Sequence, residues 1–195
     1  LNGHPCIDTS EIIRRQTIST SRSFGKMISD AEQLRASVAT FAASCCNTLR
    51  AQESAAGSVS VFACSNRFRE DLEQYSNIAT MRMDSPSSDT LEITEAAIRL
   101  ADRIYRPGIQ FKKSGVILSD ITPGLTHHIL FDPIPKRDER AELSTAIDRM
   151  NRKYGLKAVS LAVAGYGNAD WKNRTDRLTP NYLTDIDQIR TVDIS

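Results

Sequence analysis

Residues 30–68 read DAEQLRASVATFAASCCNTLRAQESAAGSVSVFACSNRF, and two patterns in this stretch decide the fold. Asp30 precedes Gln33 by three positions, as in a helix capping box, and apolar residues then recur at spacings of three and four as far as about Gln52. They are Leu34, Val38, Phe41, Ala42, Cys45 and Leu49. From Gly57 to Phe68 apolar and small residues alternate, which is the period of a strand. The stretch therefore predicts a long helix with one buried face, followed by a strand.

The flanking sequence predicts three more strands. The run at 17–24 is rich in β-branched and hydroxyl side chains and stops at Gly25. A shorter extended run lies at 78–83, and the apolar centre of 111–121 is typical of a central strand. With the strand that begins at Gly57, the chain has enough strands for a four-stranded sheet.

A second amphipathic helix is expected between the last two strands. Turn and capping residues fill 84–89, and a helical spacing then lasts until Pro107-Gly108. Its apolar positions are Ile93, Ala97, Leu100 and Ile104. The order β-α-β-β-α-β predicts an α+β fold in which two helices cover one face of a four-stranded sheet and leave the other face free for a ligand. We expect one core, to which Phe41, Leu49, Val61 and Leu118 all contribute.

The sequence changes character after residue 121. Thr122-Pro123-Gly124 interrupts the last strand, and prolines punctuate 132–136 as in a linker. A third helix is expected at 138–154, with an apolar stripe, and a short strand at 158–164. The stripe consists of Leu143, Ile147, Met150 and Tyr154. We therefore expect a small C-terminal α/β extension beyond the sheet.

Composition sets bounds on location and on partners. The formal net charge is +1 with 25% charged residues, so nucleic-acid binding would have to come from a local basic patch. No apolar run approaches the roughly 18 residues that cross a bilayer, and residues 1–6 lack the pattern of a signal peptide. We expect a cytoplasmic protein.

Few residues fit a catalytic or metal site. The sequence contains no phosphate-binding loop and no zinc-protease or nucleophile-elbow motif. His127-His128 would point to opposite sides of an extended segment, so we expect no metal site there. The cysteines lack metal-site spacing, and no neighbouring base would activate Cys45-Cys46, which we expect to be buried thiols. The four cysteines are Cys6, Cys45, Cys46 and Cys64.

Phosphate binding fits the sequence better. The segment 19–25 has backbone N–H groups, hydroxyls and the Arg22 guanidinium in a row. Positive residues recur near the other strands, and they are Arg67, Arg69, Arg82, Lys112 and Lys113, the last followed by Ser114. The alternative is that these side chains are solvated surface residues, as charged residues mostly are whatever their role.

Five ordered segments resemble the C-terminal region of Y-family DNA polymerases of the UmuC type. They are Leu1-Asn2-Gly3, Ser21-Arg22-Ser23-Phe24-Gly25, Phe111-Lys112-Lys113-Ser114-Gly115-Val116-Ile117-Leu118, Leu130-Phe131-Asp132, and Trp171 with Leu178-Thr179-Pro180-Asn181-Tyr182-Leu183-Thr184. Each segment is short, but their order and spacing match over nearly the whole chain.

The resemblance implies four parts: the end of the thumb at 1–12, a little finger domain at 13–122, a linker with a clamp-binding motif at 123–137 and a UmuC-type extension at 138–195. It implies that the free sheet face follows the major groove of template-primer DNA and contacts phosphates, which positions the duplex without reading its sequence. The residues implied in DNA binding are Ser21, Arg22, Ser23, Phe24, Gly25, Arg67, Arg82, Lys112, Lys113 and Ser114.

The family's catalytic palm, whose carboxylates hold magnesium, would lie N-terminal to these residues. We therefore expect no catalytic residue, no cofactor and no polymerase activity in this chain. The parent would be an error-prone DNA polymerase that copies past lesions in the SOS response. Its implied partners are the processed UmuD dimer, the recombinase filament and the sliding clamp.

The implied clamp-binding segment departs from the family pattern. Members commonly have a Gln, two variable residues and then Leu-Phe after the little finger, whereas this chain has His127-His128-Ile129-Leu130-Phe131. Burial of a large apolar side chain is worth about 1.5–3 kcal/mol, so the Leu-Phe end should dominate over one polar contact. The residues expected to contact the clamp are His127, Ile129, Leu130 and Phe131. The alternative is that Leu130 and Phe131 cover an edge of the core.

Two other functional classes fit the composition. One is a free-standing protein-interaction module of ferredoxin-like shape, and the other is an enzyme whose site is not visible in the sequence. Neither accounts for the five ordered segments. A salt-dependent, sequence-independent affinity for duplex DNA would distinguish the first, and a primer-extension assay would address the second.

Overall fold

The computed structural model of the chain describes residues 14–124, 137–155, 158–165, 171–172 and 179. The expected order of helices and strands is confirmed as far as the last strand of the sheet. The elements are β1 (Ile18–Ile28), α1 (Ala31–Ala51), β2 (Ser54–Cys64), β3 (Ser76–Ser87), α2 (Thr90–Ile104), β4 (Phe111–Pro123), α3 (Arg137–Tyr154) and the short 3-10 helix η1 (Ala162–Ala164).

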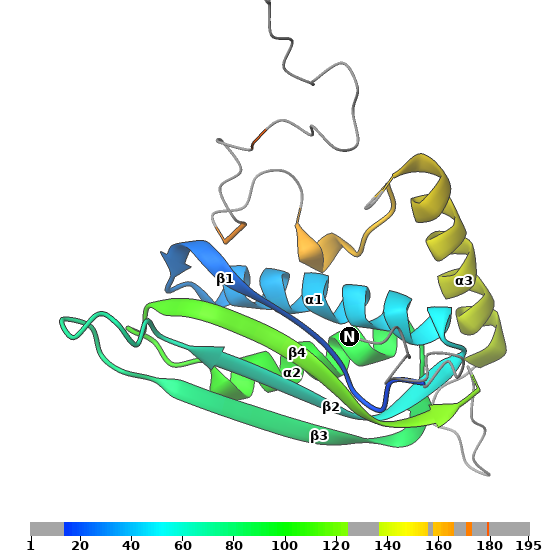
Figure 1. Ribbon diagram of the computed structural model, residues 1–195, viewed down its shortest axis with the longest axis horizontal. Coiled ribbons are helices and arrows are strands. Elements are labelled where there is room, and N and C mark those ends of the chain that lie inside the picture. The colour runs from blue at the N-terminus through cyan, green and yellow to red at the C-terminus, as the bar shows by residue number, and fades with distance from the viewer. Residues whose placement is uncertain (1–13, 125–136, 156–157, 166–170, 173–178, 180–195) are drawn as a thin grey trace, which may run out of the picture.

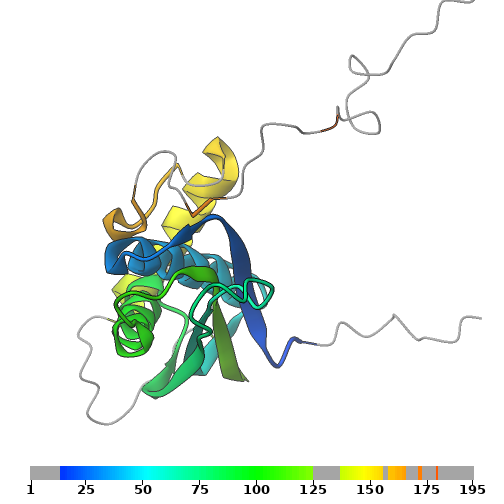
Figure 2. The same ribbon diagram turned by 90° about the vertical axis from the view of Figure 1, so that its left-hand side faces the viewer.

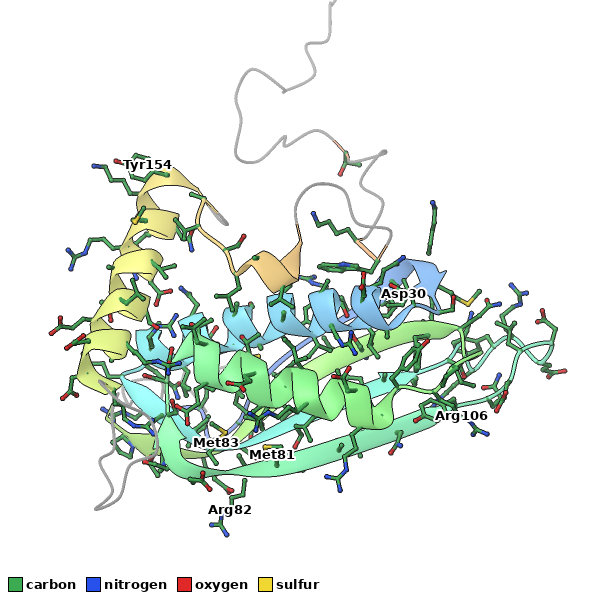
Figure 3. The ribbon with its side chains drawn as sticks, turned by 180° about the vertical axis from the view of Figure 1, so that it is seen from behind. Asp30, Met81, Arg82, Met83, Arg106 and Tyr154 are labelled. Carbon is green, nitrogen blue, oxygen red and sulfur yellow. The ribbon has the colours of Figure 1, made fainter. Side chains whose placement is uncertain are left out.

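The four strands form one antiparallel sheet in the order β1-β4-β2-β3. Both α1 and α2 pack on the same face, as Figure 2 shows from the side, and in Figure 3 the two helices lie in front of the strands. The opposite face carries no helix of the described residues (Figure 1). The expected α+β architecture is therefore confirmed.

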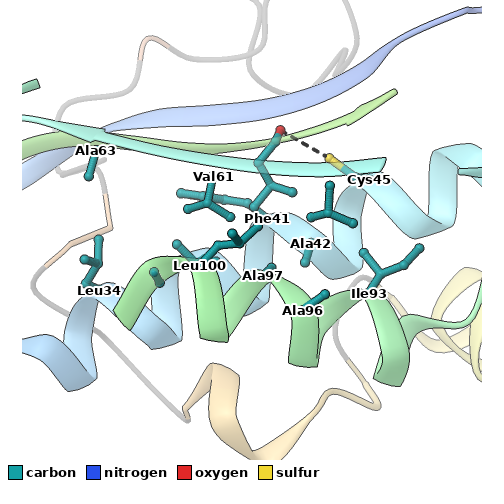
Figure 4. Packing of buried hydrophobic residues seen from close by; sticks show 14 of the residues in the cluster. Leu34, Phe41, Ala42, Cys45, Val61, Ala63, Ile93, Ala96, Ala97 and Leu100 are labelled. Atoms are coloured by element: carbon teal, nitrogen blue, oxygen red, sulfur yellow. Dashed lines mark hydrogen bonds between the residues drawn. The ribbon is translucent and has the colours of Figure 1, made fainter. Parts of the chain in front are cut away.

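The core lies between the sheet and the two helices (Figure 4). Phe41, Leu49, Val61 and Leu118 are all buried in it, as the sequence predicted. Cys45 and Cys46 are buried too, and burial raises the pKa of Cys46 to about 12. Such a thiol stays protonated at neutral pH, which fits a packing role.

Helix ends match expectation, but three strands run longer: β1 continues through Gly25 to Ile28, β3 spans Ser76–Ser87 instead of 78–83, and β4 continues through Thr122 and Pro123. Asp30 caps α1 by accepting a hydrogen bond from the Gln33 backbone N–H at 3.0 Å. The second strand begins at Ser54 rather than at Gly57, and its pairing register shifts between Ala56 and Ser58. A glycine inside a strand often marks such an irregularity, so Gly57 lies within the strand instead of starting it.

Helix α3 does not bury its apolar stripe. Leu143, Met150 and Tyr154 are exposed and Ile147 is half-buried, whereas Arg137 and Ser144 are buried against the rest of the fold. The contacts of the buried residues are polar. Leu143 of the apolar stripe and the buried Ser144 are one residue apart in the sequence, which turns them to different sides of the helix. Periodicity alone therefore identified the helix but not its buried face.

Three ion pairs join α3 to the ends of α1 and α2. Their shortest N–O distances are 2.6 Å for Arg50–Asp148, 3.0 Å for Arg137–Glu92 and 2.6 Å for Arg140–Asp89. Asp89 also caps α2, since its Oδ1 accepts from the Leu91 backbone N–H at 3.1 Å. The C-terminal extension is thus docked where α1 ends and α2 begins.

The strand expected at 158–164 is wrong. The described residues there contain the 3-10 helix η1 and no strand, and η1 lies over α1 (Figure 1). A strand here would need a neighbouring strand edge to pair its backbone groups, whereas η1 packs against helix α1. Within the described ranges, no helix combines the length and apolarity that crossing a bilayer requires.

Trp171 is 5% exposed and packs edge-on against Phe41, with ring centroids 5.7 Å apart. Its carbonyl accepts a hydrogen bond of 3.4 Å from the Gly25 backbone N–H in β1. A residue far along the chain therefore completes the outer side of α1. Several positions singled out in the sequence lie outside the described residues: Leu1-Asn2-Gly3, Cys6, His127, His128, Ile129, Leu130 and Phe131.

Candidate nucleic-acid interface

Strand alternation decides which side chains reach the open face of the sheet. Val59 and Val61 of β2 are fully buried beneath the helices, so the residues between and beside them point the other way. Pairing extends this assignment across the sheet, since directly paired residues share a face. The open-face positions are Ser19, Ser21, Ser23, Lys113, Gly115, Ile117, Ser119, Ser58, Ser60, Phe62, Cys64, Ser76, Ile78, Thr80 and Arg82.

These open-face positions are rich in hydroxyl groups and carry only positive charge. Lys113 and Arg82 are their charged residues, and the nearest carboxylate along β3 is that of Asp84, exposed two residues after Arg82. Figure 3 shows Arg82 projecting from β3 away from the helices, with Met81 and Met83 on the helix side. Hydroxyls and cations are groups that bind backbone phosphates.

Two hydroxyl groups at the centre of this face are already linked. Ser60 and Thr80 share a side-chain hydrogen bond of 2.8 Å across β2 and β3, and Ser60 is only 8% exposed. The serines of β1 are exposed instead, because β1 is an edge strand. Ser19, Ser21 and Ser23 therefore form a row of exposed hydroxyls along this edge of the face.

The neighbouring lysines at the start of β4 point to opposite faces. The Lys113 ammonium lies on the open face, 5.8 Å from the centre of the Phe62 ring. The Lys112 ammonium donates a hydrogen bond of 2.6 Å to the Phe24 carbonyl oxygen. The Lys112 ammonium is therefore already bound to a backbone oxygen, whereas the Lys113 ammonium lies beside a ring on the open face. The sequence pattern does not distinguish the two residues.

Two further predicted contacts turn inward. Ser114 is fully buried, and its hydroxyl shares a hydrogen bond of 3.2 Å with that of Ser37 in α1. Phe24 is 1% exposed and belongs to the core. Neither side chain lies on the open face, because strand alternation places both on the helix side.

The remaining predicted residues lie at the margins of the sheet. Arg22 is exposed on edge strand β1, where its pairing with Ser114 places it on the helix side. Arg67 is exposed in the loop between β2 and β3, and Gly25 is exposed in β1. Arg69, in the same loop as Arg67, is held by Asp71 at 2.5 Å. The structure brings Ser21, Ser23, Lys113 and Arg82 to one face and leaves Arg22 and Arg67 at its borders.

Sequence reasoning missed Phe62 and the serines of β2. The signal was present, because Ser58, Ser60 and Phe62 alternate with two buried valines. Polar residues in a central strand are what a sheet with one solvated face requires. Among the described residues there is no cluster of three or more His, Cys, Asp or Glu that could hold a metal ion.

Comparison with protein families and known proteins matches both parts of the chain. The model described as "impB/mucB/samB family C-terminal domain" matches residues 15–128, and one described as "Domain of unknown function (DUF4113)" matches residues 141–192. The first match includes the whole four-stranded sheet and both helices that cover it.

Similar curated proteins include Protein UmuC of Salmonella typhimurium strain LT2, which is 31% identical over 186 residues, covering 94% of this chain and 44% of that protein. Protein SamB of Salmonella typhimurium is 32% identical over 187 residues, covering 94% and 43%. Protein MucB of Escherichia coli is 31% identical over 186 residues, covering 95% and 44%. The chain thus spans less than half the length of these relatives.

Solved structures show more distant likenesses. A complex of beta-clamp processivity factor and the little finger domain of PolIV has a TM-score of 0.40 at 10% identity, covering 62% of this chain and 98% of that one. An insertion ternary complex of Dbh DNA polymerase has a TM-score of 0.42 at 12% identity, covering 55% and 29%. The family assignment therefore rests on the sequence matches. This chain belongs to the impB/mucB/samB family, whose C-terminal domain it contains at residues 15–128.

Proposed function

We propose that the open sheet face binds the backbone of template-primer DNA without reading its sequence, as the little finger of a translesion DNA polymerase. The observation that carries this proposal is a sheet face whose paired positions hold many hydroxyls and two cations, with one exposed carboxylate, Asp84, at its border. Contacts of this kind position a duplex, because phosphates are the same at every base pair.

The similarity to UmuC, SamB and MucB supports a wider role for the whole protein. We propose an error-prone polymerase of the SOS response, in which a part not included in this sequence carries out nucleotidyl transfer with magnesium. The processed UmuD dimer and the recombinase filament are proposed partners of that whole protein. The proposed role of this chain within that protein is to bind the duplex.

Salt titration of the 195-residue chain tests DNA binding. If the two cations of the face and the two at its borders, Arg22 and Arg67, neutralise three or four phosphates at about 0.9 each, log K should fall against log salt with a slope of about −3. Lys113→Ala should flatten the slope by about 0.9 and weaken binding equally on two duplexes of unrelated sequence. Fluorescence anisotropy at several salt concentrations measures both quantities.

Lys112→Ala is the matched control. Its ammonium is bound to the Phe24 carbonyl on the helix side, so this variant should keep the parent's salt slope. If Lys113→Ala leaves the slope unchanged, or loses affinity on only one of the two sequences, backbone contact by this face is refuted.

We also propose that His127, Ile129, Leu130 and Phe131 contact the sliding clamp. The support is the Leu-Phe pair and its position after the sheet domain, in the place where the resembling family has its clamp motif. Short docking motifs concentrate their binding energy in one or two large apolar side chains. Leu130 and Phe131 would therefore supply most of the affinity.

The double change Leu130→Ala with Phe131→Ala should abolish measurable clamp binding in calorimetry. DNA affinity and melting temperature should stay those of the parent. His127→Gln would supply an uncharged amide donor and acceptor and should tighten clamp binding modestly. If the alanine pair binds the clamp as well as the parent does, the segment is a linker and not a docking motif.

A further inference from the structure

The open face has a gap where Gly115 stands between Ser21 and Phe62. A Cβ atom built on Gly115 would lie 2.5 Å from the Phe62 Cε1 atom and 2.5 Å from the Ser21 Cβ atom. Real Cβ atoms do not approach other atoms so closely, so only glycine leaves room here. The Phe62 ring occupies the space that a side chain on β4 would otherwise fill.

Phe62 lies outside the hydrophobic core. Its neighbours Val61 and Ala63 are buried under the helices, whereas Phe62 itself is half-buried on the open side. It pairs with Gly115 on one side and with Ile78, which is 56% exposed, on the other. The ring lies over the glycine and stays in contact with solvent.

The ring lies close to the one lysine of this face. Lys113 is in the next row of the sheet, where its paired neighbours are Ser23 and Cys64. Its ammonium lies 5.8 Å from the Phe62 ring centre, within the roughly 6 Å at which a cation is attracted to a ring face. A lysine side chain loses rotamer entropy when it is fixed, so a neighbour that restricts it in advance helps it to bind.

We propose that Phe62 is a positioning residue of the DNA-binding face. Seated over Gly115, its ring holds the Lys113 ammonium above the sheet at the place where a backbone phosphate is bound. This inference rests on the proposed DNA-binding function and adds a residue that acts through Lys113 rather than on the phosphate itself. Gly115 contributes because it has no side chain and therefore leaves room for the Phe62 ring.

The test measures DNA affinity and salt slope for single and double variants of the full chain on one template-primer duplex. Phe62→Leu keeps apolar bulk but removes the ring, and should weaken binding about two- to fivefold and move the slope toward that of Lys113→Ala. Phe62→Tyr keeps the ring and should bind as the parent does. In a Lys113→Ala background, Phe62→Leu should cause no further loss.

Arg82→Ala is the control, because Arg82 lies two rows from Phe62 on the same face and its effect on DNA binding should be independent of Phe62. The losses caused by Phe62→Leu and Arg82→Ala should multiply, since sites without a shared contact are additive in free energy. Thermal melting confirms that each variant is folded before its affinity is compared.

The outcomes separate this inference from the function on which it rests. If Lys113→Ala itself changes neither affinity nor slope, the proposed function has failed, and this inference fails with it. If Lys113→Ala behaves as expected but Phe62→Leu binds like the parent, only the positioning role is overturned. A further loss from Phe62→Leu in the Lys113→Ala background also overturns it, because Phe62 would then act without Lys113.

Discussion

Arg50 and Asp148 form a largely enclosed link between the extension and the sheet domain, with side chains 7% and 15% exposed. Two Arg50 nitrogens reach the Asp148 carboxylate at 2.6 and 2.8 Å, and a third bond of 2.6 Å goes to the Ser88 carbonyl oxygen. Burial raises the pKa of Asp148, but the hydrogen bonds and charge of Arg50 outweigh it and leave the pKa below its ordinary value.

Asp148→Asn should lower the free energy of unfolding by about 3 kcal/mol at neutral pH, because it leaves Arg50 enclosed without its counter-charge. A lowered pKa in the folded state means that the contribution is fully present above the unfolded pKa, near 4, and is lost as pH falls from there through the lower folded pKa. Denaturant titrations of both proteins should therefore differ by a constant amount from pH 5 to 8 and converge below about pH 4.

The exposed pair Arg99–Glu95, 65% and 67% exposed, is the control for this prediction. Glu95→Gln should change stability by less than about 0.5 kcal/mol, since exposed i,i+4 pairs contribute little. Equal effects of Asp148→Asn and Glu95→Gln would show that the docked pair contributes no more than a surface pair.

Helix α3 presents neighbouring residues to opposite environments. Leu143 is 53% exposed, while Ser144 is 5% exposed and its hydroxyl lies 3.4 Å from Asp89 Oδ1. The polar residue of this pair, not the apolar one, makes the tertiary contact. The helix is thus docked by directional bonds and ion pairs rather than by its apolar stripe.

This arrangement predicts that substitution at position 143 changes stability little and that substitution at position 144 lowers it. Leu143→Ala should change stability by less than about 0.5 kcal/mol, as for a surface substitution. Ser144→Leu forces a larger side chain into an occupied space and removes a hydrogen bond, and should cost about 1–3 kcal/mol. Urea unfolding of the two variants measures both; a larger cost at Leu143 would mean that α3 docks through its stripe.

At the scale of the whole molecule, the two regions matched by separate family models share one core. Trp171 lies in the region matched at 141–192, yet it is buried against Phe41 of the region matched at 15–128. The Trp171 carbonyl also reaches Gly25 on the edge strand. The outer side of α1 is therefore complete only with the extension in place.

Trp171→Ala should reduce the stability of the sheet domain by about 3 kcal/mol, the lower end of the range for removing a buried aromatic ring. Trp171→Phe keeps an edge contact with Phe41 and should cost less. Neither change should alter the salt slope of DNA binding, because Trp171 packs on the helix side of the fold. Calorimetric melting followed by DNA titration checks both, and an unchanged melting temperature for Trp171→Ala would disprove the shared core.

The amino-acid sequence by itself determined the order of the elements, the Asp30 cap and the buried face of α1. These follow from local spacing, because a helix or strand repeats its environment every few residues. It also placed positive charge at the start of β4. It could not say that Lys113 faces the open side and Lys112 the helices, since the same local pattern fits either assignment until the strand is registered against its neighbours.

Tertiary structure alone decided the remaining features. Phe62 lies over Gly115 because β2 and β4 are paired in one particular register, although the two residues are far apart in the chain. The polar docking of α3 depends on Arg50, Asp89 and Glu92, which belong to other elements. Contacts of this kind join residues of high sequence separation, so no local period encodes them, and only the packing of the completed sheet and helices brings the partners together.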